Sequence, residues 1–186
     1  MQSEQELVSA AQQGDANAFG ELYERYVDKI FRYFMLRLGH REEAEDLAEE
    51  VFLKALQSLA SFQWRGAPFS SWLFRIANNL IVDRHRKSSG KEPLPVEDSL
   101  NIAGNENVEE LVELRSALEE TYAAMKLLTP TQQQVLALRF AGELSLAEVA
   151  KIMGKKEGAI KALQHSAVAS LRRNLSRYPA KSRESS

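Results

Sequence analysis

Residues 145–165 read SLAEVAKIMGKKEGAIKALQH, and this stretch decides the fold of the C-terminal part of the chain. Ser145 and Glu148 are spaced as a capping box, the reciprocal side-chain pair that starts a helix. Ala150 is small enough to let two crossing helices approach closely. Gly154 suits a left-handed turn because glycine has no Cβ to oppose a positive φ. The spacing predicts a helix-turn-helix.

The second helix of this motif, expected over residues 157–175, presents a basic outer side. Lysine and glutamine side chains can reach base edges in a major groove, and arginines can bind phosphates. We assign DNA contacts to Lys156, Lys161, Gln164, His165, Arg172 and Arg173. An ordinary helical hairpin is the alternative, but the spacing, the turn glycine and the local charge together favour duplex DNA.

The rest of the chain is also predicted to be helical. Apolar residues recur every three or four positions, and no stretch alternates with a period of two. The pattern predicts N-terminal helices over residues 4–13, 16–38, 41–60 and 68–87. We expect an all-α protein with two small domains, a four-helix domain and a helix-turn-helix domain, joined by a flexible linker. The expected ranges are 1–88 for the first domain, 89–107 for the linker, 108–178 for the second domain and 179–186 for a polar tail.

Charge is segregated along the 186 residues, although the net charge is only −2. Residues 62–91 carry 6 basic and 1 acidic side chains, residues 92–125 carry 1 and 9, and residues 126–186 carry 11 and 4. Basic blocks attract large anions, of which nucleic acid is the commonest in the cell. The acidic block between them is interpreted either as a solvated tether or as a segment that mimics nucleic acid.

Several functional classes are excluded or discouraged by composition. The chain has no cysteine, which excludes disulfides and thiolate metal sites. The histidines His40, His85 and His165 lie in unrelated segments, and no phosphate-binding glycine loop occurs. We expect no catalytic residues, no metal site and no cofactor. The acidic start and the short apolar runs predict a cytoplasmic protein without membrane insertion.

The first basic block interleaves aromatic and cationic residues. The segment FQWRGAPF, residues 62–69, precedes a helix whose opposite side is polar. Aromatic rings beside cations suit unpaired bases, which offer a π-face and a phosphate at each step. The candidates are Trp64, Arg65, Arg75, Asn78, Asn79 and Arg86, with Ser71 on the same polar side. The alternative is an aromatic core with a solvated basic face, and Trp72 is expected mainly to pack.

The helix expected over residues 41–60 has an acidic side, which includes Asp46 and Glu49 and has Leu53 at its margin. Its apolar residues are Leu47, Val51, Ala55, Leu56 and Leu59. No Glu-x-x-His pair points to a carboxylate-bound metal centre. The acidic side is either solvated or a docking surface for a basic partner.

Three motifs resemble the extracytoplasmic-function (ECF) sigma factors, group IV of the major bacterial RNA polymerase sigma factor family. They are EDLAEEVFLKA at 45–55, WLFRIANNLIVD at 72–83, and the pair LTP at 128–130 with LSLAEVA at 144–150. The resemblance implies a non-enzymatic transcription initiation factor whose partners are core RNA polymerase, promoter DNA and an anti-sigma factor.

The resemblance also implies roles for particular residues. Polymerase binding maps onto Asp46, Glu49, Glu50 and Lys54. Minus-ten promoter contacts map onto the loop before the helix at 68–87 and onto that helix, and minus-thirty-five contacts map onto the helix after Gly154. Many family members read Gly-Thr-Val-Lys-Ser-Arg where this chain reads GAIKAL at 158–163, so base contacts there cannot be copied. A conventional helix-turn-helix regulator that acts without being a polymerase subunit is the alternative.

Overall fold

The computed structural model describes residues 2–64, 67–88 and 120–176, and every regular element in these ranges is a helix. The N-terminal elements are α1 (Glu4–Gln12), α2 (Ala16–Leu38), α3 (Arg41–Ser58), the short 3₁₀-helix η1 (Leu59–Ser61) and α4 (Phe69–Ser88). The C-terminal elements are α6 (Pro130–Leu136), the π-helical η2 (Ala137–Ala141), α7 (Leu146–Met153) and α8 (Glu157–Ser176), preceded by helical residues 120–126. The all-α prediction is confirmed. The expected linker and polar tail lie outside the described residues.

The helix ends follow from local hydrogen bonds. The Ser145 hydroxyl accepts from the Glu148 amide at 3.2 Å, and the Glu148 carboxylate accepts from the Ser145 amide at 2.7 Å. Thr129 and Gln132 form the same reciprocal pair at the start of α6. Gly154 ends α7 with a φ of 62°, the left-handed conformation that the turn requires. Both capping boxes are therefore formed.

The N-terminal core is built by α2, α3 and α4. α3 packs against α2 and α4, and large aromatic side chains fill the space between the helices. Phe34, Phe69 and Phe74 are fully buried, and the Phe74 ring meets the Tyr33 ring edge-on at 5.5 Å between centres. This packing fixes the position and rotation of α4, which carries the predicted promoter contacts.

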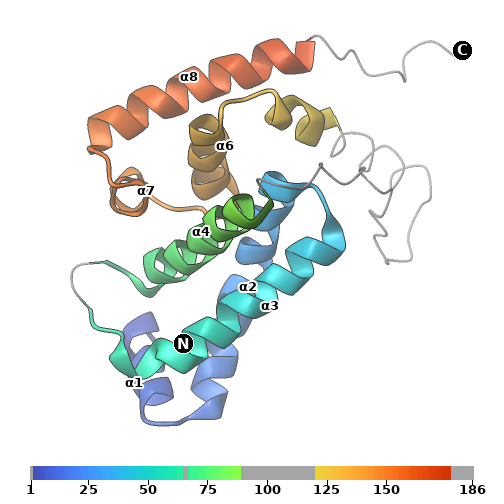
Figure 1. Cartoon of the computed structure of the whole chain (residues 1–186). Helices are drawn as coiled ribbons and strands as arrows, with labels where there is room; N and C mark the ends of the chain where they lie inside the picture. Colours follow the sequence, from blue (N-terminus) through green and yellow to red (C-terminus); the bar gives the residue numbers. More distant parts are fainter. Residues whose placement is uncertain (1, 65–66, 89–119, 177–186) are drawn as a thin grey trace, which may run out of the picture.

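The C-terminal helices share a continuous hydrophobic core with the N-terminal ones. η2 packs against α2, and α7 packs against α4. A Cβ at Gly142 would lie 3.0 Å from the Phe74 ring and 2.7 Å from the Leu138 carbonyl oxygen, so glycine permits this approach. The Tyr122 hydroxyl donates a hydrogen bond to the Leu38 carbonyl. Figure 1 shows α8 as the outermost helix, with α6 and α7 between it and α4.

Candidate polymerase and nucleic-acid interfaces

The outer face of α3 carries the residues predicted to bind polymerase. Asp46, Glu49 and Lys54 are exposed, and the Lys54 ammonium lies 3.3 Å from the Glu50 carboxylate one turn earlier. This ion pair lies at the surface, where such pairs add little to stability. The charged side chains remain accessible to a partner.

Two exposed leucines lie among these charges. Leu53 is 59% exposed and Leu56 is 53% exposed, whereas Val51 and Ala55 face the core. The sequence pattern places Leu53 at the margin of the acidic side of this helix and Leu56 in its apolar run, whereas the structure exposes both. The signal was present, because a helical wheel puts Leu53 almost opposite the buried residues. Apolar side chains surrounded by charges are typical of a protein–protein interface.

An aromatic cluster precedes and opens α4. The Trp64 and Phe62 rings meet edge-on at 5.5 Å between centres, and Phe62 lies 4.9 Å from Trp72 and 5.6 Å from Phe69. Phe69 is fully buried, but Trp64 is 37% exposed. The cluster is therefore held by the core while it presents Trp64 at the surface. Trp72 packs within it, as expected.

A surface hollow of about 390 Å³ lies beside this cluster. Phe62 and Trp72 supply apolar walls, and Ser71 and Arg75 line it from α4. Lys151 reaches the same hollow from α7. A cavity of this size with aromatic and cationic walls suits a flat base attached to a phosphate.

The other predicted contacts on α4 differ in accessibility. Arg75 and Asn79 are exposed, and so is Arg86, whose guanidinium lies 3.8 Å from the Asp83 carboxylate. Arg65 lies outside the described residues. Arg75 lies in the second turn of α4 and Arg86 in the last, so the two exposed cations are spaced along the helix as contacts to a nucleic-acid backbone would be.

Asn78 and Ser71 face the C-terminal helices. The Asn78 Oδ1 accepts from Gln134 Nε2 at 2.7 Å and from the Tyr33 hydroxyl at 3.5 Å. Ser71 is only 2% exposed, and its hydroxyl donates to the Glu148 carboxylate at 3.2 Å. The placement of Ser71 on an outward polar side was therefore wrong. A helical wheel shows which residues share a side of α4, but not that another domain covers part of that side.

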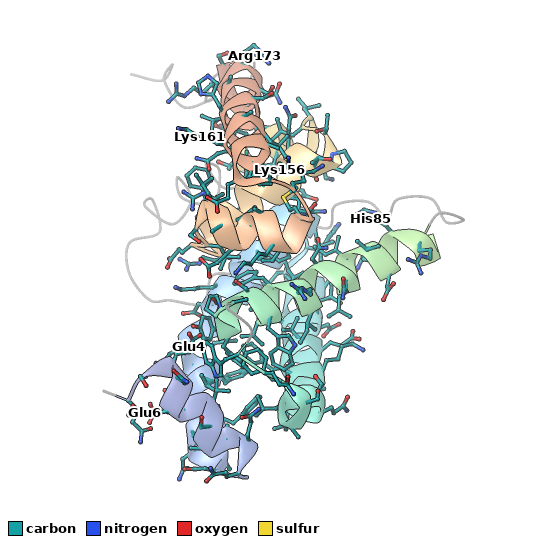
Figure 2. All side chains as sticks on the ribbon, turned by 90° about the vertical axis from the view of Figure 1, so that its left-hand side faces the viewer. Glu4, Glu6, His85, Lys156, Lys161 and Arg173 are labelled. Carbon is teal, nitrogen blue, oxygen red and sulfur yellow. The ribbon has the colours of Figure 1, made fainter. Side chains whose placement is uncertain are left out.

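The recognition helix α8 presents most of its predicted contacts to solvent. The exposed residues are Lys156, which lies in the turn before α8, and Lys161, His165, Arg172 and Arg173. Figure 2 shows Lys156 near the turn and Arg173 near the far end of the helix. Gln164 is half-buried, and its Oε1 accepts a 2.8 Å hydrogen bond from Arg139 Nε. Arg139 therefore holds Gln164 in place beside the exposed lysine and histidine.

The buried side of the helix-turn-helix agrees with its predicted spacing. Val149 and Ile160 are fully buried, and Ala150 is 6% exposed. These residues join α7 to α8 and fix the angle at which α8 leaves the domain. The exposed side of α8 is thus held on a rigid support.

Glu148 links the cap of α7 to α4. Burial raises the pKa of its carboxyl, but hydrogen bonds from Ser145, Ser70 and Ser71 outweigh this and leave the pKa below its usual range. The Ser70 hydroxyl donates to it at 3.1 Å. The carboxylate is therefore held ionised at the contact between the two sets of helices.

In the described part of the chain, no group of three or more His, Asp or Glu side chains is arranged to hold a metal ion. No helix in those ranges is both long enough and apolar enough to cross a membrane.

Comparison with known proteins identifies the family. Residues 22–90 match the family model for Sigma-70 region 2, and residues 124–173 match Sigma-70, region 4. The chain is 42% identical over 171 residues to the ECF RNA polymerase sigma factor BldN of Streptomyces coelicolor, covering 91% of this chain and 65% of that protein. It is 32% identical over 181 residues to the ECF RNA polymerase sigma factor SigW of Bacillus subtilis, covering 90% and 94%. The chain belongs to the ECF RNA polymerase sigma factors.

The fold of this sigma factor also occurs in a solved structure, that of the sigma factor RpoE in complex with the anti-sigma factor NepR from Bartonella quintana. The two sigma chains are 22% identical, with a TM-score of 0.67, and the match covers 85% of this chain and 96% of that one. In this ECF sigma factor, the region 2 match includes α3, the aromatic cluster and α4. The region 4 match includes the helix-turn-helix.

Proposed function

We propose that this sigma factor binds core RNA polymerase through α3, captures unpaired promoter bases beside α4, and binds duplex promoter DNA through α8. The observation that carries the proposal is the pairing of two different surfaces in one chain. One is a part-exposed tryptophan beside a cation-lined hollow, and the other is a helix-turn-helix with a basic outer side. Promoter opening needs both a single-strand site and a duplex site.

For polymerase, we propose a contact centred on Leu53 and Leu56. The surrounding charges are Asp46, Glu49, Glu50 and Lys54. Buried apolar side chains supply most of the affinity of an interface, while charges at its edge determine specificity and the rate of encounter.

For the minus-ten element, the proposed contacts are Trp64, Arg65, Arg75, Asn78, Asn79 and Arg86. Opening a duplex costs about 1.4 kcal/mol of stacking for each base-pair step. A base stacked on an aromatic ring returns about 1–3 kcal/mol. Trp64 and the neighbouring hollow can therefore offset much of the cost of opening one or two steps.

For the minus-thirty-five element, the proposed contacts are Lys156, Lys161, Gln164, His165, Arg172 and Arg173. Lys161, Gln164 and His165 lie in the first half of α8, where a recognition helix meets base edges. Arg172 and Arg173 lie further along and would neutralise phosphates.

We further propose the domain ranges 1–88 and 108–178, with residues 89–107 as the tether between the two DNA sites. The proposal includes action in the cytoplasm, no catalytic activity, and an anti-sigma factor as a partner. The last point is supported by the RpoE structure, in which a sigma factor of the same fold is bound to the anti-sigma factor NepR.

Run-off transcription tests this function. Purified core polymerase with this protein should transcribe genomic fragments that core polymerase alone does not. The double variant Asp46→Lys, Glu50→Lys should lose this activity and co-purification with core polymerase. Glu21→Lys, the reversal of an exposed charge on α2, is the matched control and should retain both. A conventional helix-turn-helix regulator would instead bind its operator without polymerase and give no run-off product.

A further inference from the structure

Helix α1 precedes the part of the chain that matches Sigma-70 region 2. Its apolar side packs against α2 and η1 (Figure 1), and Leu7 and Val8 on this side are fully buried. η1 leads directly into the segment that begins at Phe62 and carries Trp64. α1 is therefore packed against the element from which the proposed single-strand site begins.

The last residue of α1 is hydrogen-bonded to the backbone on both sides of the η1 turn. Gln12 Nε2 donates to the Leu59 carbonyl oxygen at 3.0 Å and to the Phe62 carbonyl oxygen at 2.8 Å. An amide nitrogen carries two hydrogens, so these two contacts use all of its donors. The Phe62 amide donates to the same Leu59 oxygen at 3.0 Å. The Gln12 side chain thus fixes the backbone at both ends of this turn.

The backbone at Phe62 determines where Trp64 lies, because only one residue separates them. The Phe62 ring, which is 9% exposed, also contacts the Trp64 ring edge-on. A ring that must first be ordered binds a base more weakly, because the entropy of ordering is then lost on binding. A fixed Phe62 backbone therefore favours stacking of a base on Trp64.

A second contact connects the other end of α1 to the same aromatic cluster. The Glu4 carboxylate accepts a 2.5 Å hydrogen bond from the Tyr26 hydroxyl, and the Tyr26 ring lies 6.0 Å from the Phe69 ring. Burial, together with this hydrogen bond, raises the pKa of Tyr26 above its usual range, so the hydroxyl remains a donor at physiological pH. α1 is thus attached to the surroundings of Trp64 at both of its ends.

We propose that Gln12 is a positioning residue for the single-strand site. Its side-chain amide holds the carbonyls of Leu59 and Phe62 so that Trp64 is presented in a fixed place to an unpaired promoter base. Gln12 acts through the backbone of this segment and not by contact with DNA. The proposal rests on the proposed function of Trp64 as the residue on which a base stacks.

The test measures binding of a single-stranded minus-ten oligonucleotide to holoenzyme assembled from core polymerase and the full chain. Gln12→Glu keeps the shape of the side chain but replaces its donor nitrogen with an oxygen that repels the two carbonyls. We expect it to weaken binding about three- to tenfold, the effect of about one lost hydrogen bond. Gln12→Lys, which is long enough and again a donor, should recover most of this loss.

Gln13→Glu is the matched control. It introduces the same charge at the neighbouring exposed residue, whose side chain makes neither of the two hydrogen bonds. Gln12→Met, which has no donor and no charge, should reproduce the loss and replaces Gln12→Glu if that variant does not assemble with core polymerase. Binding to core polymerase and to a minus-thirty-five duplex should be unchanged in all of these variants.

A double-mutant cycle separates positioning from a general structural role. If Gln12 acts through Trp64, Gln12→Glu combined with Trp64→Ala should bind the oligonucleotide no more weakly than Trp64→Ala alone. Additive losses would overturn the proposal, because Gln12 would then act independently of Trp64.

The single variants distinguish this proposal from the function on which it rests. Normal oligonucleotide binding by Trp64→Ala would overturn the proposed single-strand site itself. Weak binding by Trp64→Ala but normal binding by Gln12→Glu, or an equal loss in Gln13→Glu, would overturn only the role of Gln12.

Discussion

The side-chain amide of Gln134 on α6 donates a 2.7 Å hydrogen bond to the amide oxygen of Asn78 on α4. The Tyr33 hydroxyl, 3.5 Å away, also donates to that oxygen. Burial raises the pKa of Tyr33 to about 12, so this hydroxyl keeps its proton and remains a donor at physiological pH. Asn78 is thus held between α2 and α6, and its oxygen is already occupied by these two donors.

Replacing Gln134 should release Asn78. We expect Gln134→Ala to lower the free energy of unfolding by about 1 kcal/mol, the usual value of one hydrogen bond. The same variant should bind a single-stranded minus-ten oligonucleotide more tightly, as measured by fluorescence anisotropy. Gln133→Ala is the matched control, because Gln133 donates to Leu128 within the C-terminal helices. Equal affinities for the two variants would show that Gln134 does not restrict Asn78.

The two tryptophans should respond differently to truncation. Trp64→Ala should cause only a small fall in melting temperature, since Trp64 is 37% exposed, but a large loss of permanganate reactivity at promoter thymines. Trp72→Ala, which removes a ring packed against both Phe62 and Phe69, should cost about 3 kcal/mol of stability. Normal promoter opening by a well-folded Trp64→Ala protein would contradict the proposed stacking role.

The exposed leucines of α3 should carry polymerase affinity. Leu53→Asp and Leu56→Asp should each weaken binding to core polymerase at least tenfold. Each replaces an apolar contact with a carboxylate that would be buried in the interface without an opposite charge. The melting temperature should change little. Val82→Asp, at a position 46% exposed on α4, is the matched control and should bind core polymerase normally. Loss of core binding in all three variants would point to a general effect of added charge.

Phosphate and base contacts on α8 should be separable by their salt and sequence dependence. Arg172→Ala should weaken binding to every duplex and reduce the slope of log K against log salt by about 0.9, the contribution of one phosphate. Lys161→Ala should instead change which upstream sequence is preferred. Titrations of several duplexes at three salt concentrations measure both effects. If Lys161→Ala keeps its affinity and preference, Lys161 is not a base contact.

Acidification should open the domains. The pKa values of Glu143 and Glu148 are lowered in the folded protein, so the unfolded or separated state takes up protons first as pH falls. Their contribution to closure is complete above the usual carboxyl pKa of about 4.3 and is lost as pH falls through the lowered values. Fluorescence energy transfer between labels at Gln57→Cys on α3 and Ala162→Cys on α8 should therefore decrease as the pH falls below about 4.3, and Glu148→Gln should reduce that change.

Glu6 provides a control for the pH experiment. Its pKa is also lowered, first by its hydrogen bond with the Ser3 backbone, and it completes a capping box on α1. Glu6→Gln should alter thermal stability but leave the pH dependence of energy transfer unchanged. If Glu6→Gln and Glu148→Gln have the same effect on energy transfer, the acid response reflects a general loss of stability rather than loss of the contact between α7 and α4.

The helices and the helix-turn-helix could be predicted because their determinants are local. The Ser145 and Glu148 cap, the Gly154 turn and the period of buried residues each involve groups a few positions apart. Such local signals do not depend on how distant parts of the chain fold. The basic outer side of α8 was predictable for the same reason.

Only the tertiary structure decided which side of α4 is covered and by what. Arg32 and Glu143 are 111 residues apart in the sequence, and Asn78 and Gln134 are 56 apart, so no local sequence pattern predicts either contact. The left-handed backbone at Glu143 has no sequence signal of its own, because glutamate rarely adopts it. These contacts arise because Gly142 lets η2 approach Phe74 closely, and that approach brings the Glu143 carboxylate within reach of Lys29 and Arg32 on α2.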